Sequence, residues 1–220
     1  TDLQFAAMIS FPSSLCLADF PCGRGVAVTR AVQRGEVLLT VPLAQCWTAT
    51  SARRRLEVPV AMTEKEAIIA ELMVLKESEE KSSHVALLSS LESMNLPPFW
   101  KESDLAELEG SEVHTHSVRL QEELQEDFET LQRKLLGCEI KASFKTFQWA
   151  WSIYSSRVMS LTTDTGSIFA IVPGLDMFNH SPTVSPGLFQ LCGDVVQVKA
   201  GEDLTTGQQA YINYAANMYN

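Results

Sequence analysis

The spacing of apolar residues predicts helices in the middle of the chain. Between 120 and 135, apolar side chains recur every three or four residues, which places them on one helix face: Leu120, Leu124, Phe128, Leu131 and Leu135. A second stripe of this kind runs from Phe144 to Leu161. Further upstream, Thr63-x-x-Glu66 has the form of a capping box and opens another apolar-periodic segment. We therefore expect the region from 50 to 161 to be helical.

Both ends of the chain contain short apolar runs bounded by turn residues, which are typical of β-strands. The predicted strands cover 26–28, 37–41, 168–172, 188–191, 195–199 and 211–213. Residues 33–36 form a predicted turn, and Cys192–Gly193–Asp194 forms the turn of a predicted hairpin. Strands at the two ends must pair with each other to bury their apolar faces. The helical region is then an insertion in one β-rich fold.

Composition and charge narrow the classes of partner. The 220 residues are 45% apolar and 20% charged, which is typical of a globular protein. Most of the net charge of −10 comes from residues 101–130, which contain ten acidic and two basic side chains. Nucleic acid is not an expected partner, because a phosphate backbone requires a basic surface. A basic protein partner is compatible with the acidic segment, but an ordinary solvated helix is the favoured explanation.

Cysteine usage indicates a reducing compartment, and hydropathy gives no sign of a membrane helix. The five cysteines are odd in number and include no C-x-x-C pair, so we expect neither a disulfide framework nor a zinc cluster. Cytoplasm, nucleus and plastid all fit this prediction. No apolar run approaches the ~20 residues of a membrane helix, so no membrane partner is expected. Because the chain opens at Thr1, we expect it to be part of a longer protein, and we expect a monomer.

Two short clusters are candidates for ligand binding. In Cys22–Gly23–Arg24–Gly25, the glycines would let a backbone approach a ligand closely, although an ordinary turn explains them as well. Ser156–Arg157 ends a strongly apolar segment. Its arginine could hold a carboxylate by two hydrogen bonds or could simply complement a helix dipole.

Two further clusters follow predicted strands. Asp176-x-x-Asn179–His180 comes after a strand and a proline, at the kind of strand edge where binding sites lie. A capped turn is the alternative, and no second His or Cys stands at metal-ligand spacing. Tyr211–Ile212–Asn213–Tyr214 ends the last predicted strand. A tyrosine here presents its hydroxyl to a site, or is a core residue with a hydrated tip.

The order of these four clusters resembles that of the SET-domain methyltransferases. Within that family, the chain is most similar to the branch of the RuBisCO large-subunit lysine methyltransferase, and the similarity extends from about residue 20 to 220. The stretch Pro97–Pro98–Phe99–Trp100 also looks like the helical insertion of this branch. The resemblance implies an α+β protein, a β-rich SET fold with knot-like C-terminal threading that is split by a helical insertion. The implied division is 1–50 and 162–220 for the SET domain and 51–161 for the insertion. We expect the C-terminal substrate-binding domain of this branch to lie outside this chain.

The resemblance also implies S-adenosyl-L-methionine as cofactor and a lysine side chain of a protein as substrate. The implied cofactor-binding residues are Cys22, Gly23, Arg24, Gly25, Arg157, Asp176, Asn179, His180 and Tyr214. Ser156, Met159, Asp176 and Tyr211 are the implied lining of the lysine channel, and Tyr214 is the implied catalytic residue. No metal is implied.

This reaction class suits the residue types present. A methyl group on a sulfonium is already activated, so the main requirement is to orient a neutral amine towards it. A free lysine has a pKa of ~10.4. An apolar channel next to a positive sulfur lowers that pKa. The hydroxyl of Tyr214 could orient the amine and stabilise the polarised methyl group.

Some departures from the branch keep other functions open. Cys22 replaces a commonly acidic residue near the cofactor's amino group, and Ala215 replaces a frequent glycine. One alternative is protein-histidine N-methylation on the same fold, because imidazole needs less deprotonation than lysine. Another is a SET-like binding module without catalytic activity, which the loss of the acidic residue and the missing C-terminal cover both favour.

Overall fold

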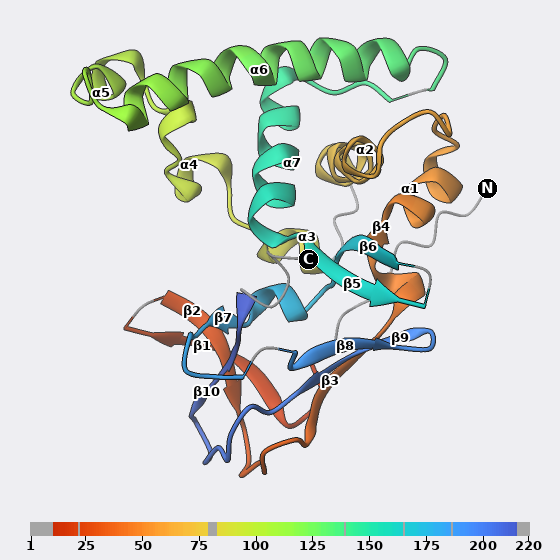
Figure 1. The fold of residues 1–220 in the computed structure, drawn as a ribbon, viewed down its shortest axis with the longest axis vertical. Coiled ribbons are helices and arrows are strands. Elements are labelled where there is room, and N and C mark those ends of the chain that lie inside the picture. The colour runs from red at the N-terminus through yellow and green to blue at the C-terminus, as the bar shows by residue number, and fades with distance from the viewer. Residues whose placement is uncertain are drawn as a thin grey trace. The chain divides into compact units, whose positions relative to one another are not determined.

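The computed structural model describes residues 11–21, 23–78, 83–138, 140–164, 166–185 and 187–214. They form two compact units (Figure 1). One unit comprises 1–51, 82–84 and 157–220 and contains the strands; the other comprises 52–81 and 85–156 and is helical. The helical prediction for the middle of the chain and the β prediction for its ends are therefore confirmed in outline.

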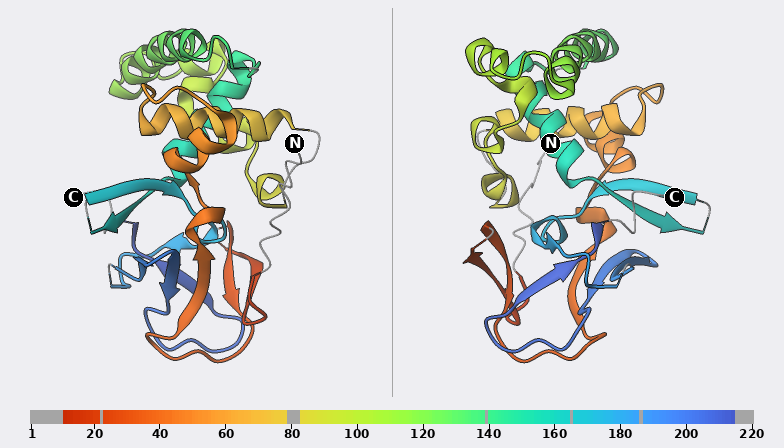
Figure 2. Two further views of the ribbon diagram at one scale, coloured as in Figure 1. Left: turned by 90° about the vertical axis from the view of Figure 1, so that its right-hand side faces the viewer. Right: turned by 60° about the vertical axis from the view of Figure 1, so that its left-hand side comes forward.

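The β-rich unit contains three small sheets among the described residues. The first has the order β1-β2-β10-β7, the second β3-β9-β8 and the third β4-β6-β5, and their strands can be followed by colour in Figure 2. The strands are β1 (Leu15–Phe20), β2 (Gly23–Val28), β3 (Val37–Pro42), β4 (Trp47–Thr48), β5 (Met159–Thr163), β6 (Gly166–Ile171), β7 (Asn179–His180), β8 (Phe189–Cys192), β9 (Val195–Lys199) and β10 (Gln209–Ile212). Short 3-10 helices lie at η1 (Leu43–Gln45) and η3 (Leu175–Met177).

Each sheet joins strands from both ends of the chain. β3 pairs with β9, β4 pairs with β6, and β10 pairs with β2, all antiparallel. The predicted hairpin is confirmed as β8 and β9, with Cys192 opposite Val195. Pairing between the ends buries the apolar faces that neither end could cover alone, as the sequence predicts. The sequence did not predict β1, β4, β5 or β7.

The helical unit is built around α2. Its helices are α1 (Ala49–Leu56), α2 (Glu64–Glu77), α3 (Ser83–Leu87), α4 (Leu91–Met94), η2 (Pro97–Phe99), α5 (Glu102–Ala106), α6 (Glu112–Lys134) and α7 (Phe144–Arg157); α1, α3 and α7 each begin or end in the β-rich unit. α2 is buried along nearly all of residues 67–75, as expected of a central helix. Phe128 of α6 packs against Phe144 and Phe147 of α7, with ring centroids 5.4 and 5.3 Å apart. The predicted stripe on α6 is therefore its buried face.

The second predicted stripe is wrong at its end. The helix stops at Arg157, and Leu161 lies in strand β5, opposite Ile168 of β6. The apolar spacing continues past the helix because the buried side of the strand begins at once. Leu161 is buried in the β-rich unit instead of extending the helix.

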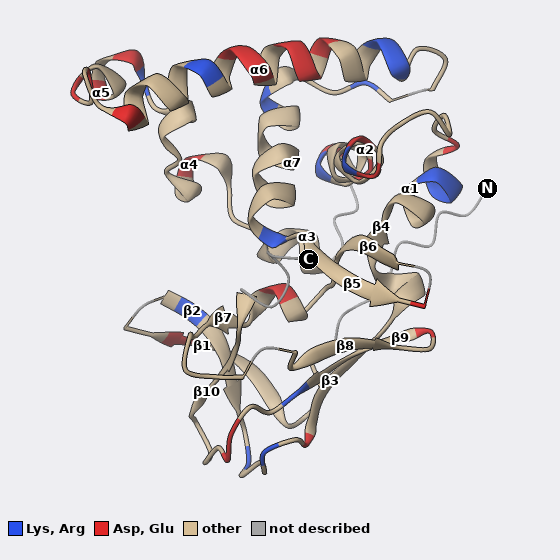
Figure 3. Ribbon diagram, viewed as in Figure 1, with Lys and Arg blue, Asp and Glu red and all other residues tan. Residues whose placement is uncertain are grey.

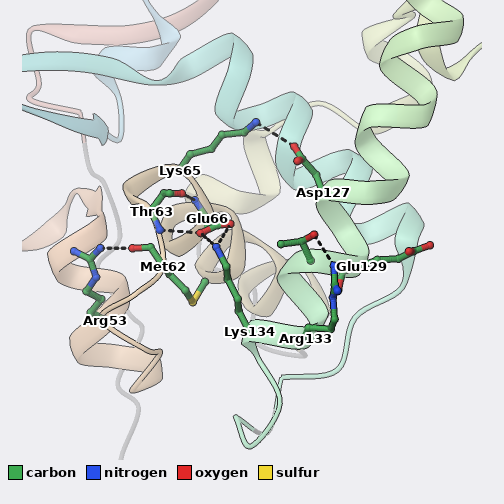
Figure 4. A network of polar contacts seen from close by, with 10 residues as sticks. Arg53, Met62, Thr63, Lys65, Glu66, Asp127, Glu129, Arg133 and Lys134 are labelled. Carbon is green, nitrogen blue, oxygen red and sulfur yellow. Dashed lines mark hydrogen bonds and ion pairs between the residues drawn. The ribbon is translucent and has the colours of Figure 1, made fainter.

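Polar contacts tie the start of α2 to the end of α6 (Figure 4). The capping box is confirmed: the Thr63 hydroxyl accepts the Glu66 N–H, and the Glu66 carboxylate accepts the Thr63 N–H. Glu66 also accepts two hydrogen bonds from Lys134 Nζ, at 2.7 and 2.9 Å. Burial opposes ionisation of Glu66, but the hydrogen bonds from Lys134 and Thr63 outweigh it and hold the pKa of this carboxyl below its ordinary value.

The acidic segment of the sequence lies on α5 and α6, where Asp and Glu recur along the helices (Figure 3). Most of these side chains are exposed, opposite the buried stripe of α6. Among the helices that the structure describes, none has both the length and the apolar character needed to cross a bilayer.

Candidate functional site

The sheet β1-β2-β10-β7 brings three of the predicted clusters together. Strand β10 lies between β2, which carries the Gly-Arg-Gly cluster, and β7, which consists of Asn179 and His180 (Figure 1). Tyr211 of β10 is opposite Asn179 in the parallel pair, and Ile212 is opposite His180. The Gly-Arg-Gly cluster belongs to strand β2 itself, whereas the sequence placed it in the turn before the strand. Segments separated by more than 150 residues thus share one sheet.

Gly25 is buried in a cradle formed by the ends of two amide side chains. A Cβ at this position would be 2.2 Å from Gln209 Nε2 and 2.8 Å from Asn179 Nδ2. The Asn179 amide also donates to the Arg24 carbonyl at 3.1 Å. Gln209 is 8% exposed, and its Nε2 has no hydrogen-bond partner among the described atoms, while its Oε1 accepts the Tyr211 hydroxyl at 2.8 Å. Two side-chain amides therefore converge on a bare stretch of backbone.

Tyr214 is fixed at both its backbone and its hydroxyl. Its O–H donates to the Phe178 carbonyl at 2.7 Å, and its N–H donates to His180 Nδ1 at 3.1 Å. Its ring also packs against the His180 ring, with centroids 5.2 Å apart. Burial raises the pKa of the phenol, the charge of Arg157 opposes this shift, and that of Asp176 adds to it. The residue is still 39% exposed, so a neutral phenol is held in place while part of it stays accessible.

Arg157 and Asp176 form the charged part of the site. Arg157 Nη1 donates to the Asp176 backbone carbonyl at 2.8 Å and to its Oδ2 at 3.2 Å. Asp176 Oδ1 accepts the Gly174 N–H at 3.0 Å, and Gly174 has a φ of 84°, which favours glycine. Within the described part of the chain, the other guanidinium nitrogens of Arg157 donate to no protein group. They are oriented donors that a carboxylate could accept.

His84 also contacts Asp176, and the sequence analysis did not predict this residue as part of the site. Its Nε2 is 3.0 Å from Asp176 Oδ2, and the two residues are 92 positions apart. It lies in α3, at the point where residues 82–84 belong to the β-rich unit. No motif surrounds it, so only the three-dimensional structure reveals the contact. Gln209, which packs over Gly25, was likewise not singled out by sequence reasoning.

Two of the other predicted channel residues, Ser156 and Met159, make their described contacts elsewhere in the fold. Ser156 donates to the Ser152 carbonyl of its own helix at 2.7 Å. Met159 is buried in β5, opposite Ala170. The Tyr211 hydroxyl is used by Gln209, and Cys22 lies outside the described residues, as does Ala215. The Asp176 carboxylate has no exposed surface, so its place in a lysine channel stays a prediction, like those of Ser156, Met159 and Tyr211.

Metal ligation has no candidate in the described ranges, where no group of three or more His, Cys, Asp or Glu could hold an ion. What the arrangement offers is a set of hydrogen-bond donors, a glycine cradle and one phenol. Such a site is suited to hold a polar, carboxylate-bearing molecule and to orient a reacting atom.

Comparison with known proteins identifies the fold. No family model matches the chain. It is 27% identical over 225 residues to the chloroplastic [fructose-bisphosphate aldolase]-lysine N-methyltransferase of Arabidopsis thaliana, covering 92% of this chain and 45% of that protein. It is 24% identical over 217 residues to the chloroplastic ribulose-1,5 bisphosphate carboxylase/oxygenase large subunit N-methyltransferase of Pisum sativum, covering 90% and 44%. The chain thus spans about half the length of the curated relatives it matches.

Solved structures agree with these relatives. The SET domain of LSMT bound to lysine and AdoHcy superposes with a TM-score of 0.76 at 19% identity, over 94% of this chain and 50% of that one. Rubisco LSMT bound to AdoMet superposes with a TM-score of 0.73 at 20% identity, over 94% and 49%. The predicted α+β SET fold and the resemblance to the SET-domain lysine methyltransferases of this branch are therefore confirmed. The knot-like threading and the division at 51 and 161 stay predictions.

Proposed function

We propose that this chain is the catalytic part of an S-adenosylmethionine-dependent protein-lysine N-methyltransferase. The observation that carries the proposal is the convergence of β2, Asn179–His180, Arg157 and Tyr214 within the β-rich unit. The names of the relatives, an aldolase-lysine N-methyltransferase and a Rubisco large subunit N-methyltransferase, support the same activity. So do the solved neighbours bound to AdoMet, AdoHcy or lysine.

The residues present fit such a cofactor. Gly23 of β2 is exposed and has no heavy atom within 4 Å of the place that a Cβ would take, so the backbone there is open to close approach by a cofactor, whereas Gly25 is buried beneath the Gln209 and Asn179 amides. Arg157 binds Asp176 through Nη1, and its Nε and Nη2 donors would suit the cofactor's carboxylate. Asn179 and His180 would hold the amino-acid and adenine portions, largely through their backbone groups. When bound, S-adenosylmethionine supplies an activated methyl group on a sulfonium.

The task of the protein is then to orient the acceptor. Tyr214 stays a neutral phenol, since burial raises its pKa, and its hydroxyl is aimed by the hydrogen bond to the Phe178 carbonyl. A fixed hydroxyl can orient an incoming amine and stabilise charge that develops during transfer, with little reorganisation. A lysine amine must arrive neutral, and an apolar channel lowers its pKa towards that state. Ser156, Met159, Asp176 and Tyr211 are the proposed residues of this channel.

Two wider features belong to the same proposal. Residues 51–161 would be the insertion that splits the SET domain, and the final segment of the fold would thread the loop of Asn179–His180 in a knot-like manner. The substrate would be a protein lysine, in a reducing intracellular compartment, without nucleic acid, membrane or metal, and the enzyme would act as a monomer.

Radiolabelled methyl transfer tests the function. The chain is incubated with labelled S-adenosylmethionine and with purified fructose-bisphosphate aldolase or Rubisco large subunit, the proteins named by the relatives. We expect label on lysine, located by mass spectrometry of peptides. The Tyr214→Phe variant should lose most turnover but retain cofactor binding, whereas Tyr154→Phe, a half-buried tyrosine of α7 in the helical unit, should behave as wild type.

Other outcomes would contradict the assignment. Label on histidine would replace it by the histidine-methylating alternative. Cofactor binding without transfer to either protein or to a soluble protein extract would favour the non-catalytic module. Unchanged turnover in Tyr214→Phe would remove the tyrosine from the chemistry.

A further inference from the structure

His84 is a buried titratable residue that the proposed mechanism does not use. It is 2% exposed, and its Nε2 lies 3.0 Å from Asp176 Oδ2. Its ring packs at a tilt against Trp47 of β4, with centroids 5.2 Å apart. All three residues belong to the β-rich unit. A polar side chain is placed in such surroundings only if its hydrogen bond compensates for the loss of water.

The partners of Asp176 assign the hydrogen atom of this contact. An ionised carboxylate only accepts hydrogen bonds. Oδ1 of Asp176 accepts from the Gly174 N–H, and Oδ2 accepts from Arg157 Nη1. Since the carboxylate is the acceptor in both, His84 Nε2 is assigned as the donor of the third bond. Asp176 is thus held by a backbone amide, a guanidinium and an imidazole, and its side chain has no exposed surface.

The third donor matters because of what Asp176 holds in turn. Arg157 Nη1 is bound by both the carboxylate and the backbone carbonyl of Asp176, and this fixes the plane of the guanidinium. Without His84, Oδ2 would keep one donor in a buried setting, and the carboxylate would turn to recover a second one. The guanidinium would follow, because a planar fork binds well only in one orientation.

We propose that His84 is a positioning residue for cofactor binding, acting through Asp176 to fix the direction of the free donors of Arg157. This inference rests on the proposed function, because it assigns those donors to the cofactor's carboxylate. A merely structural role is the competing explanation, in which the imidazole ring fills space beside Trp47 and its hydrogen bond is incidental.

Three substitutions of one residue separate these explanations. His84→Phe keeps a ring against Trp47 but removes the donor. His84→Gln places an amide nitrogen close to the position of Nε2, whereas His84→Asn carries the same amide on a shorter side chain that does not reach Asp176. We expect His84→Phe and His84→Asn to raise the Kd for S-adenosylmethionine about tenfold, the loss of a hydrogen bond to a charged group. His84→Gln should restore the Kd to within about threefold of wild type.

Calorimetric titration gives each Kd, and thermal unfolding of the same samples reports stability. The positioning role is supported if the Kd is high in His84→Phe and His84→Asn, which lack a donor to Asp176, and low in His84→Gln, which keeps one. This holds even if all three variants melt at similar temperatures. Equal Kd values in wild type and His84→Phe would overturn it. A Kd that follows only the melting temperature, with Gln no better than Asn, would also overturn it.

Failure of the proposed function can be recognised separately. If wild type binds no S-adenosylmethionine, the function is contradicted and the cofactor role of His84 falls with it. The interaction between His84 and Asp176 is then tested without cofactor. The urea midpoints of unfolding are measured for His84→Phe, Asp176→Asn and the double variant. Coupling predicts that the double variant shifts the midpoint by less than the two single shifts together. Additive shifts would show that the contact has no energetic consequence.

Discussion

The cradle around Gly25 makes a sharp prediction about a single methyl group. In Gly25→Ala the new Cβ would lie 2.2 Å from Gln209 Nε2 and 2.8 Å from Asn179 Nδ2, well inside contact distance. The φ of Gly25 is outside the left-handed region, so alanine brings no left-handed strain, and the cost is that of displacing the ends of two amide side chains. Overpacking of this kind typically costs about 1–3 kcal/mol. Moving the Gln209 amide aside also breaks its bond from the Tyr211 hydroxyl, worth about 1 kcal/mol.

We therefore expect Gly25→Ala to lower the free energy of unfolding by about 2 kcal/mol, of which about 1 comes from the low end of the overpacking range, because the obstacles are side-chain ends, and about 1 from the lost hydrogen bond. Gln209→Ala alone should cost about 1 kcal/mol, since it removes the acceptor of the Tyr211 hydroxyl. The double variant should be clearly more stable than the sum of the two predicts, because the nearest obstacle to the methyl group is gone. Urea denaturation followed by circular dichroism provides the three values. Additive effects, or a Gly25→Ala variant as stable as wild type, would refute the packing argument.

Three further predictions concern the helix cap and two titrating groups. Thr63→Ala should lower the free energy of unfolding by about 1 kcal/mol, and Thr63→Ser should not, since serine keeps the capping oxygen; urea denaturation measures both. The folded state lowers the pKa of Glu66, so its pair with Lys134 contributes stability above the unfolded pKa of ~4.3 and loses it as the pH falls through the folded pKa. The difference in free energy of unfolding between wild type and Glu66→Gln should therefore shrink in acid. Equal differences at pH ~7 and pH ~3 would contradict this. Burial raises the pKa of Tyr214, so the stability that its neutral phenol contributes is present below pH ~10 and is lost as the pH rises through the folded pKa. The phenolate absorbance that Tyr214→Phe removes should develop above pH ~10. Its appearance nearer neutrality would contradict the burial.

Local features of the fold were predictable from the sequence. The capping box at Thr63 and the stripe on α6 depend on residues three or four apart, and both are confirmed. The pairing of the two chain ends was predictable from the need to bury their apolar faces, although the register was not. The end of α7 was not predictable, because Leu161 continues the apolar spacing of the helix from within strand β5.

The candidate site was predictable in its parts and not in its connections. Its clusters were visible because glycines, Asn-His and a terminal tyrosine stand out against their surroundings, and their family order supplied the rest. The contact between His84 and Asp176 spans 92 residues, and nothing local marks either residue as the partner of the other. The contact of the Gln209 amide with Gly25 could not be predicted from the sequence either, since it depends on the register of β10 against β2.

Calorimetric titration of S-adenosylmethionine into wild type and Arg157→Gln tests the central claim most directly. If the strands and loops of the β-rich unit enclose one cofactor, wild type should bind a single equivalent with saturation. Arg157→Gln keeps a polar side chain but loses the charged fork, so it should bind at least about tenfold more weakly. A wild-type protein that releases no saturable heat, or a variant that binds as tightly as wild type, would contradict the account.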